Sequence, residues 1–229
     1  MHDGILLIDK PSGWTSFDVV NYVRKLVAQA QGKKPKNTKV GHTGTLDPLA
    51  TGLLVLLIGS YTKRAPELTK LDKTYEVTMK LGETSTTGDD EGEKTVVSSK
   101  QPVASEIEKS LRSFVGEGLQ TPPAYSAIKV NGQRAYKLAR AGKEVKLEPR
   151  PITVYSLELV VYSYPEVQFV AKVSSGTYIR SLVEDIGSML GTGAYMSALC
   201  RTKVGEFDIK DSLAVKSLNA EAIAQHLSL

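Results

Sequence analysis

The sequence has very few residues of the kinds that build disulfide frameworks or metal centres. It holds one cysteine, Cys200, in 229 residues, which excludes a set of internal disulfide bonds. Its three histidines are far apart in the sequence, so together with one cysteine they form no recognisable zinc-ligand pattern. The chain is long enough to bury a core without such supports. A reduced, cytoplasmic protein is the expectation.

Long apolar runs are also missing. The longest, residues 53–58 (LLVLLI), is far too short to cross a bilayer. No basic segment followed by an apolar one opens the chain, so no secretory signal is visible. The sequence therefore gives no reason to expect a membrane or secreted protein.

Several well-known catalytic signatures are absent. There is no phosphate-binding P-loop, no dinucleotide fingerprint, no zinc-protease motif and no serine-hydrolase elbow. Ser126 and Lys129 match the S-x-x-K pattern of penicillin-recognising enzymes, but the companion motifs S-D-N and K-T-G do not occur. Serine acyl chemistry is therefore disfavoured.

Charge is almost balanced, with a net value of +4, but it is unevenly spread along the chain. Residues 19–46 hold six Lys or Arg and no acid, and residues 129–150 hold seven Lys or Arg against two acids. Residues 83–93 reverse the sign, with five acids and no base. Separate basic blocks indicate a surface that binds a polyanion. Taken singly, each block is more simply a solvated surface.

Residues 41–52 (GHTGTLDPLATG) form a glycine-rich stretch with one carboxylate, Asp47, and one imidazole, His42. The apolar run that follows predicts a buried strand. A lone carboxylate on a tight loop beside a core strand can present a nucleophile rigidly. These residues alone equally allow a structural turn whose Asp and Thr side chains cap their own backbone.

Hydrophobic periodicity predicts a mixture of strands and helices. Strands are expected at 4–9, 53–58, 74–81, 94–99, 125–130, 152–162, 167–174 and 201–209. Helices are expected at 17–31, 61–71, 134–140 and 220–227, from about residue 105 to at least Val115, and from about residue 178. Local hairpins together with long crossovers favour an α+β fold with a mixed sheet over a doubly wound parallel one. Segment 121–151 has rigid proline-containing ends and a basic middle, which suits a mobile arm.

Seven motifs, taken in order, resemble those of the TruB family of tRNA pseudouridine synthases, which make pseudouridine-55 in the T loop. Residues 41–54 are similar to the family's signature loop. The other motifs are KPSGWTS at 10–16, KTY at 73–75, the acidic loop 82–92, QTPPAYSAIK at 120–129, SGTYIRSL at 175–182 and the closing strand at 199–207. Together they cover nearly the whole chain.

The resemblance implies a pseudouridine-synthase-like α+β fold, with a mixed, mainly antiparallel sheet flanked by helices. It implies a single catalytic domain over residues 1–229, with 121–151 as an insertion that grips RNA. Family members usually carry a C-terminal PUA domain, and the roughly twenty residues after Phe207 are too few for one. The expectation is a short form in which the catalytic domain and its arm recognise the T arm.

The resemblance also implies residue roles. Asp47 would be the nucleophile, and Arg180 would pair with it and keep it ionised. Tyr75 would stack on the target uracil and help to remove the C5 proton. The sequence leaves open whether the carboxylate attacks C1′ or C6, or acts as a base to form a glycal.

Further contacts to uridine and RNA follow from the same resemblance. Tyr178 and Leu199 would line the uridine pocket, and His42 would wedge into the T loop. The remaining candidates for substrate or RNA contacts are Lys10, Asp89, Lys129 and Arg201. Cys200 stands where many relatives have a second arginine, so one phosphate contact is either missing or supplied by Lys203.

The implied reaction is an isomerisation without redox change, so neither metal nor cofactor is expected. The expected partner is the T arm of tRNA, with no membrane, no obligate protein partner and a monomeric state. Two alternatives stay open. One is a tRNA-folding factor that binds RNA without chemistry, and the other is a synthase that acts on another RNA or depends on a guide complex.

Overall fold

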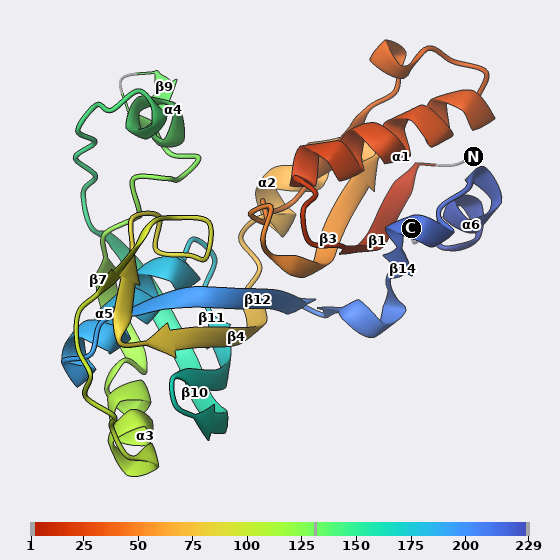
Figure 1. Cartoon of the computed structure of the whole chain (residues 1–229). Helices are drawn as coiled ribbons and strands as arrows, with labels where there is room; N and C mark the ends of the chain where they lie inside the picture. Colours follow the sequence, from red (N-terminus) through yellow and green to blue (C-terminus); the bar gives the residue numbers. More distant parts are fainter. Residues whose placement is uncertain (1–2, 131, 228–229) are drawn as a thin grey trace. The chain divides into compact units, whose positions relative to one another are not determined.

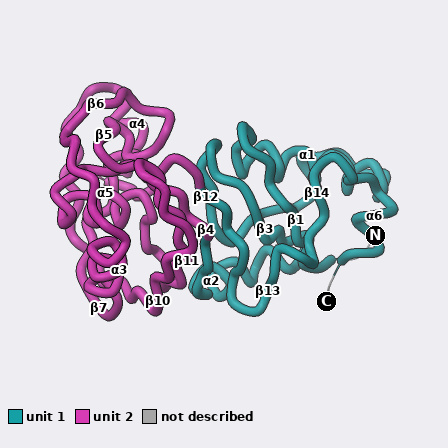
Figure 2. Tube along the Cα trace, turned by 60° about the horizontal axis from the view of Figure 1, so that its bottom comes forward, with its two compact units in different colours: residues 1–75, 199–229 teal, residues 76–198 magenta. Residues whose placement is uncertain are grey.

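The computed structural model describes residues 3–130 and 132–227 (Figure 1). The chain divides into two compact units, one formed by residues 1–75 and 199–229 and the other by residues 76–198 (Figure 2). We call them unit 1 and unit 2. The division falls within two strands, β4 (Lys73–Leu81) and β12 (Ala194–Val204), which therefore have residues in both units.

Unit 1 is organised around β3 (Thr51–Ile58), the apolar run expected to be a buried strand. Strand β1 (Gly4–Lys10) pairs antiparallel with β3 along its whole length. Strand β2 (Val40–His42) pairs antiparallel with the end of β3, and the last part of β12 pairs parallel with its start. Strand β14 (Leu213–Ala214) pairs parallel with β1. The loop that holds Asp47 therefore links two neighbouring strands, β2 and β3.

Both faces of β3 are covered, which explains why its sequence is apolar without alternation. Leu54, Leu56 and Ile58 pack in a core with helices α1 (Ser16–Ala30) and α6 (Ala220–Gln225). Leu53, Val55 and Leu57 pack in a second core with α2 (Ala65–Leu68) and the end of β12. Helix α1 starts as expected, because Thr15 and Asp18 form a reciprocal capping box at its first turn.

In unit 2 four strands run in the order β4, β11, β10, β7. Strands β10 (Arg150–Ser163) and β11 (Glu166–Val173) form the hairpin that the sequence predicts, and β7 (Gly116–Gln120) pairs antiparallel with β10. Helix α3 (Ala104–Ser113) contacts β10 and also α5 (Ile179–Leu190). The α+β class with a mixed, mainly antiparallel sheet and flanking helices is therefore confirmed.

Shorter elements complete the two units. The arm within 121–151 contains β8 (Lys129–Val130), β9 (Gln133–Arg134) and α4 (Ala135–Arg140), and in Figure 1 it extends away from α3. A two-stranded sheet joins β5 (Glu83–Ser85) to β6 (Lys94–Val96). A hairpin strand, β13 (Phe207–Asp208), follows β12. The 3-10 helices are Pro35–Asn37, Gly59–Arg64, Ile209–Asp211 and Val215–Ser217.

Several predicted element boundaries are wrong, and among them the strand expected at 94–99 ends at Val96. The last long strand starts at Ala194 rather than at 201, and it ends at Val204 before the β13 return. The strand expected at 125–130 is reduced to β8. The helix expected to include Val115 ends at Ser113, because the chain turns through Gly116 (φ +126°) into β7. Strand β7 has two glycines and no apolar alternation, so periodicity could not reveal it.

Candidate active site

Asp47 lies on the loop between β2 and β3 of unit 1, and this loop, residues 43–50, is fixed at both ends. The Thr43 amide donates to the Val55 carbonyl at 3.1 Å, which ties the start of the loop to β3. The Ala50 amide donates to the carbonyl of Asp47 at 3.1 Å and closes a tight turn after the carboxylate. Three side chains from other parts of unit 1 hold the middle of the loop.

The first of these is Ser16, at the start of α1. Its hydroxyl accepts from the Leu46 amide at 2.8 Å and donates to the Leu46 carbonyl at 3.0 Å. Ser16 and Leu46 are only 2% and 3% exposed, so water does not replace these bonds easily. Leu46, the residue before Asp47, is therefore bonded to the first residue of α1.

The second is Lys10, at the end of β1. Its ammonium donates to the carbonyls of Pro11, Trp14 and Pro48 at 2.9, 2.6 and 3.3 Å, which uses all three of its protons. Burial lowers the pKa of Lys10 to about 8, and the negative charge of Asp47 partly opposes that shift. The side chain is fully buried and bonded to backbone, so it supports the loop, and the substrate or RNA contact that the sequence predicts here stays a prediction.

The third is Arg201, on β12. Its Nε donates to the Leu53 carbonyl at 2.8 Å and its Nη2 donates to the Gly44 carbonyl at 3.0 Å. Arg201 pairs with Gly52 at the start of β3 in a parallel register. Its side chain therefore lies near both β3 and the loop before it, and it bonds a carbonyl of each. With 2% exposure Arg201 too supports the loop, and its RNA contact stays a prediction. These bonds hold the backbone on both sides of Asp47 in one geometry, which suits a residue that has to be placed accurately.

His42, the last residue of β2, is half-buried beside the same loop. The Gly44 amide donates to its Nδ1 at 3.3 Å, so this ring nitrogen carries no proton. Burial lowers the pKa of His42 below its usual 6.5, and the charge of Arg201 lowers it further. The ring is therefore neutral near pH 7, with its proton on Nε2.

The two other candidates in unit 1 are Tyr75 and Leu199. Tyr75 lies on β4 and is 8% exposed. Two positions earlier, Lys73 donates to the carbonyls of Thr69 and Leu71 at 2.7 and 2.5 Å, and burial lowers its pKa to about 8. Leu199 lies on β12, and its carbonyl accepts from the Thr51 hydroxyl at 3.4 Å. Both candidates lie on strands, which are more rigid than loops.

Unit 2 holds Arg180 and Asp89 together. The Arg180 Nε lies 3.7 Å from the Asp89 Oδ2, and both side chains are buried. The guanidinium also donates to the carbonyls of Thr87 and Tyr125, at 3.1 and 2.8 Å. Asp89 accepts from the Thr87 hydroxyl and the Glu91 amide. Arg180 therefore links the acidic loop to the first part of the arm.

Tyr178, the N-cap of α5, is also tied to the arm. Gln120 accepts from the Tyr178 amide at 2.7 Å and donates to the Tyr178 carbonyl at 3.0 Å, and it is 4% exposed. The Ser181 hydroxyl donates to the Thr121 carbonyl at 3.1 Å. Sequence reasoning missed Gln120 as a positioning residue; the one available signal was its place directly before the Thr-Pro-Pro break. Lys129, further along the arm, is exposed and pairs across β8 and β9 with Arg134.

Residues 3–130 and 132–227 contain neither a cluster of metal-ligand side chains nor a helix that could span a membrane. No three His, Cys, Asp or Glu side chains in this part of the chain come together as metal ligands would. None of its helices combines the length and apolar character needed to span a bilayer.

Two family models match this sequence. The TruB family pseudouridylate synthase N-terminal domain matches residues 32–179, and the tRNA pseudouridylate synthase B C-terminal domain matches residues 180–227. The tRNA pseudouridine synthase B of Opitutus terrae is 44% identical over 222 residues, covering 95% of this chain and 88% of the relative. The protein of that name from Aquifex aeolicus is 44% identical over 216 residues, covering 93% and 72%.

Solved structures give the same fold. A chain of a Cbf5–Nop10–Gar1 complex matches with a TM-score of 0.72 and 30% identity, over 94% of this chain and 53% of that one. A chain of an H/ACA RNP bound to a substrate RNA containing 2′-deoxyuridine matches with a TM-score of 0.68 and 28% identity, over 94% and 52%. This chain spans about half the length of each.

Proposed function

This chain belongs to the TruB family of pseudouridylate synthases, and we propose that it converts the uridine at position 55 in the T loop of tRNA to pseudouridine. The observation that carries the proposal is the fixed loop of Asp47. Lys10, Ser16 and Arg201 hold the backbone on both sides of this carboxylate. A carboxylate that acts as a nucleophile gains most from such fixed geometry.

The proposed reaction rearranges one nucleotide without an outside reactant. The N1–C1′ bond of uridine breaks, the base turns, and a C5–C1′ bond forms. The C5 proton leaves and N1 gains a proton, so atoms and charge balance. Asp47 is the proposed nucleophile, and Tyr75 is the proposed stacking partner of the uracil and helper in removing the C5 proton.

The target base has to leave the stack before it reacts, which costs a few kcal/mol. Stacking on an aromatic side chain such as Tyr75 contributes about 1–3 kcal/mol in return. His42 is proposed as the wedge in the T loop. Its lowered pKa supports that role, because a neutral ring fills space among bases without the cost of burying a charge.

The test uses an unmodified tRNA transcript with the wild-type protein and Asp47→Asn. We expect the wild type to form pseudouridine at position 55, mapped by chemical modification and reverse transcription, and Asp47→Asn to bind the transcript without forming it. Asp211→Asn is a matched control, since it makes the same change at an exposed position of unit 1. Full turnover by Asp47→Asn would show that the nucleophile is another residue.

A second candidate is a synthase that works only within a larger complex, since the structural relatives are chains of a Cbf5–Nop10–Gar1 complex and of an H/ACA RNP. The same assay separates the two. Modification of the transcript, and of an isolated T-arm hairpin, by the purified chain alone supports the stand-alone enzyme. Tight binding without modification by the wild type supports a guide-dependent synthase or a tRNA-folding factor.

A further inference from the structure

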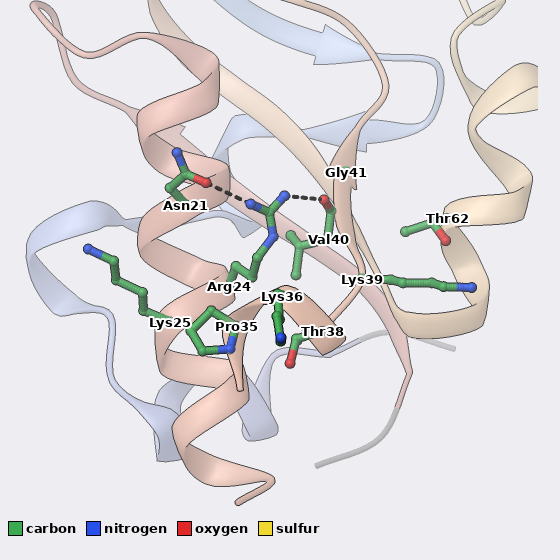
Figure 3. Close-up of a pocket in the computed structure, with 10 residues that line it drawn as sticks. All are labelled: Asn21, Arg24, Lys25, Pro35, Lys36, Thr38, Lys39, Val40, Gly41 and Thr62. Atoms are coloured by element: carbon green, nitrogen blue, oxygen red, sulfur yellow. Dashed lines mark hydrogen bonds between the residues drawn. The ribbon is translucent and has the colours of Figure 1, made fainter. Parts of the chain in front are cut away.

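A surface hollow of about 510 Å³ lies in unit 1 beside α1 (Figure 3). Its walls come from α1, the 3-10 turn that starts at Pro35, strand β2 and Thr62. Four of its lining residues are cations and none is an acid; the cations are Arg24, Lys25, Lys36 and Lys39. The hollow therefore concentrates positive charge in a concave surface, where an anion gains most from it.

Arg24 has a structural task in this hollow. Its guanidinium donates to the Asn21 side-chain oxygen at 2.7 Å and to the Val40 carbonyl at 3.1 Å, so it ties β2 to α1. Figure 3 shows both bonds, with Lys25 extending to one side of Arg24 and Lys39 to the other. Arg24 thus forms the floor of the hollow, and the lysines form its rim.

The three lysines keep their positive charge for a ligand. Lys25, Lys36 and Lys39 are exposed, and no ion pair to an acid within the described residues involves any of them. The sequence supplies no acid between residues 19 and 46 to neutralise them. Ammonium groups spread around a floor match an extended anion with several charges better than a single compact one.

The hollow also has a definite position relative to the Asp47 loop. Gly41 lines it, and the next residue of β2 is His42, at the start of that loop. Since only His42 separates the lining residue Gly41 from the Asp47 loop, an RNA strand bound at the loop has the hollow within reach. We propose that the hollow binds consecutive phosphates of the RNA strand next to the target nucleotide, an inference that rests on the proposed function. Such contacts fix the register of the RNA and carry no sequence information.

The test measures how RNA affinity depends on salt. The triple variant Lys25→Ala/Lys36→Ala/Lys39→Ala leaves Arg24 and the loop intact, and the control Lys33→Ala/Lys34→Ala removes two exposed lysines just before the turn that do not line the hollow. The probe is an unmodified T-arm hairpin, with binding followed by fluorescence anisotropy between low and moderate salt. Each lost phosphate contact lowers the slope of log K against log salt by about 0.7–0.9.

We expect the triple variant to lose about two units of slope and to raise the Kd about 10- to 100-fold at 0.1 M salt. Its single-turnover rate at saturating RNA and its thermal midpoint should stay near those of the wild type, because the lysines touch neither the base nor the core. The control variant should keep a Kd within about threefold of wild type and lose clearly less slope than the triple variant.

Three results overturn the inference. They are an unchanged slope and Kd in the triple variant, equal losses in the control variant, or a loss of rate at saturating RNA without a loss of affinity. The proposed function fails separately, if the wild type binds the hairpin but forms no pseudouridine in it. In that case the comparison of slopes still decides whether the hollow binds RNA.

Discussion

Removing the hydroxyl of Ser16 should loosen the loop that carries Asp47. The Ser16→Ala change leaves the amide and the carbonyl of Leu46 without their partner, and Leu46 is 3% exposed. Each unpaired buried group costs about 1–3 kcal/mol. Two such groups give a loss of about 2–4 kcal/mol, since a surface loop can relax toward water in part. A backbone shift of about 1 Å at the carboxylate should also lower kcat about 10- to 100-fold.

The assay for this change is urea unfolding followed by the fluorescence of Trp14, the single tryptophan, which lies two residues from Ser16. The urea midpoint should fall by about 1–2 M, given slopes of about 1–3 kcal/mol per M. Ser110→Ala is the matched control, because this buried hydroxyl on α3 finds no partner in the described structure. It should be neutral or slightly stabilising. A wild-type midpoint and turnover in Ser16→Ala would refute the reasoning.

Three further predictions concern other fixed points of the two units. Gly52→Ala should destabilise by more than about 3 kcal/mol in urea unfolding, because φ is +97° and a Cβ would meet the β12 backbone; Gly118→Ala, with open space, should be neutral. Gln120→Leu should cost about 1–3 kcal/mol and speed proteolysis of the arm, because it removes the bond to the Tyr178 amide, whereas the Tyr178 carbonyl still accepts from the Leu182 amide. Because the folded pKa of His42 lies below 6.5, the unfolded chain binds the proton first, so unfolding free energy should fall as pH drops below 6.5. His42→Gln should remove that part of the pH dependence.

Local patterns were enough to place most elements of the fold. The run at 53–58 is apolar at every position, and apolar residues at helical spacing over 17–31 place α1. Both signals depend only on residues that are close together in the sequence. They can therefore be recognised without knowing how the rest of the chain folds. The errors fall where local signals are weak, as in the glycine-containing strand β7 and at the start of β12.

The candidate site divides in the same way. The sequence itself singles out Asp47 as a lone carboxylate on a glycine-rich loop. The ordered motifs show the family resemblance, and the resemblance implies the role proposed for Asp47. The sequence could not show which groups the other polar residues of the site bind. Lys10 and Arg201 read as cations available for RNA, whereas the structure buries both against backbone carbonyls of the loop and its neighbours.

The sequence by itself therefore established the class of fold, the family resemblance and the identity of the candidate nucleophile. Only the tertiary structure decided which residues hold the loop of Asp47 in place and which cations lie exposed around the hollow. Ser16 reaches across 30 positions to Leu46, and Arg201 reaches across 157 to Gly44. Contacts of this length depend on the register between strands and on burial, and no pattern within a few residues encodes either of them.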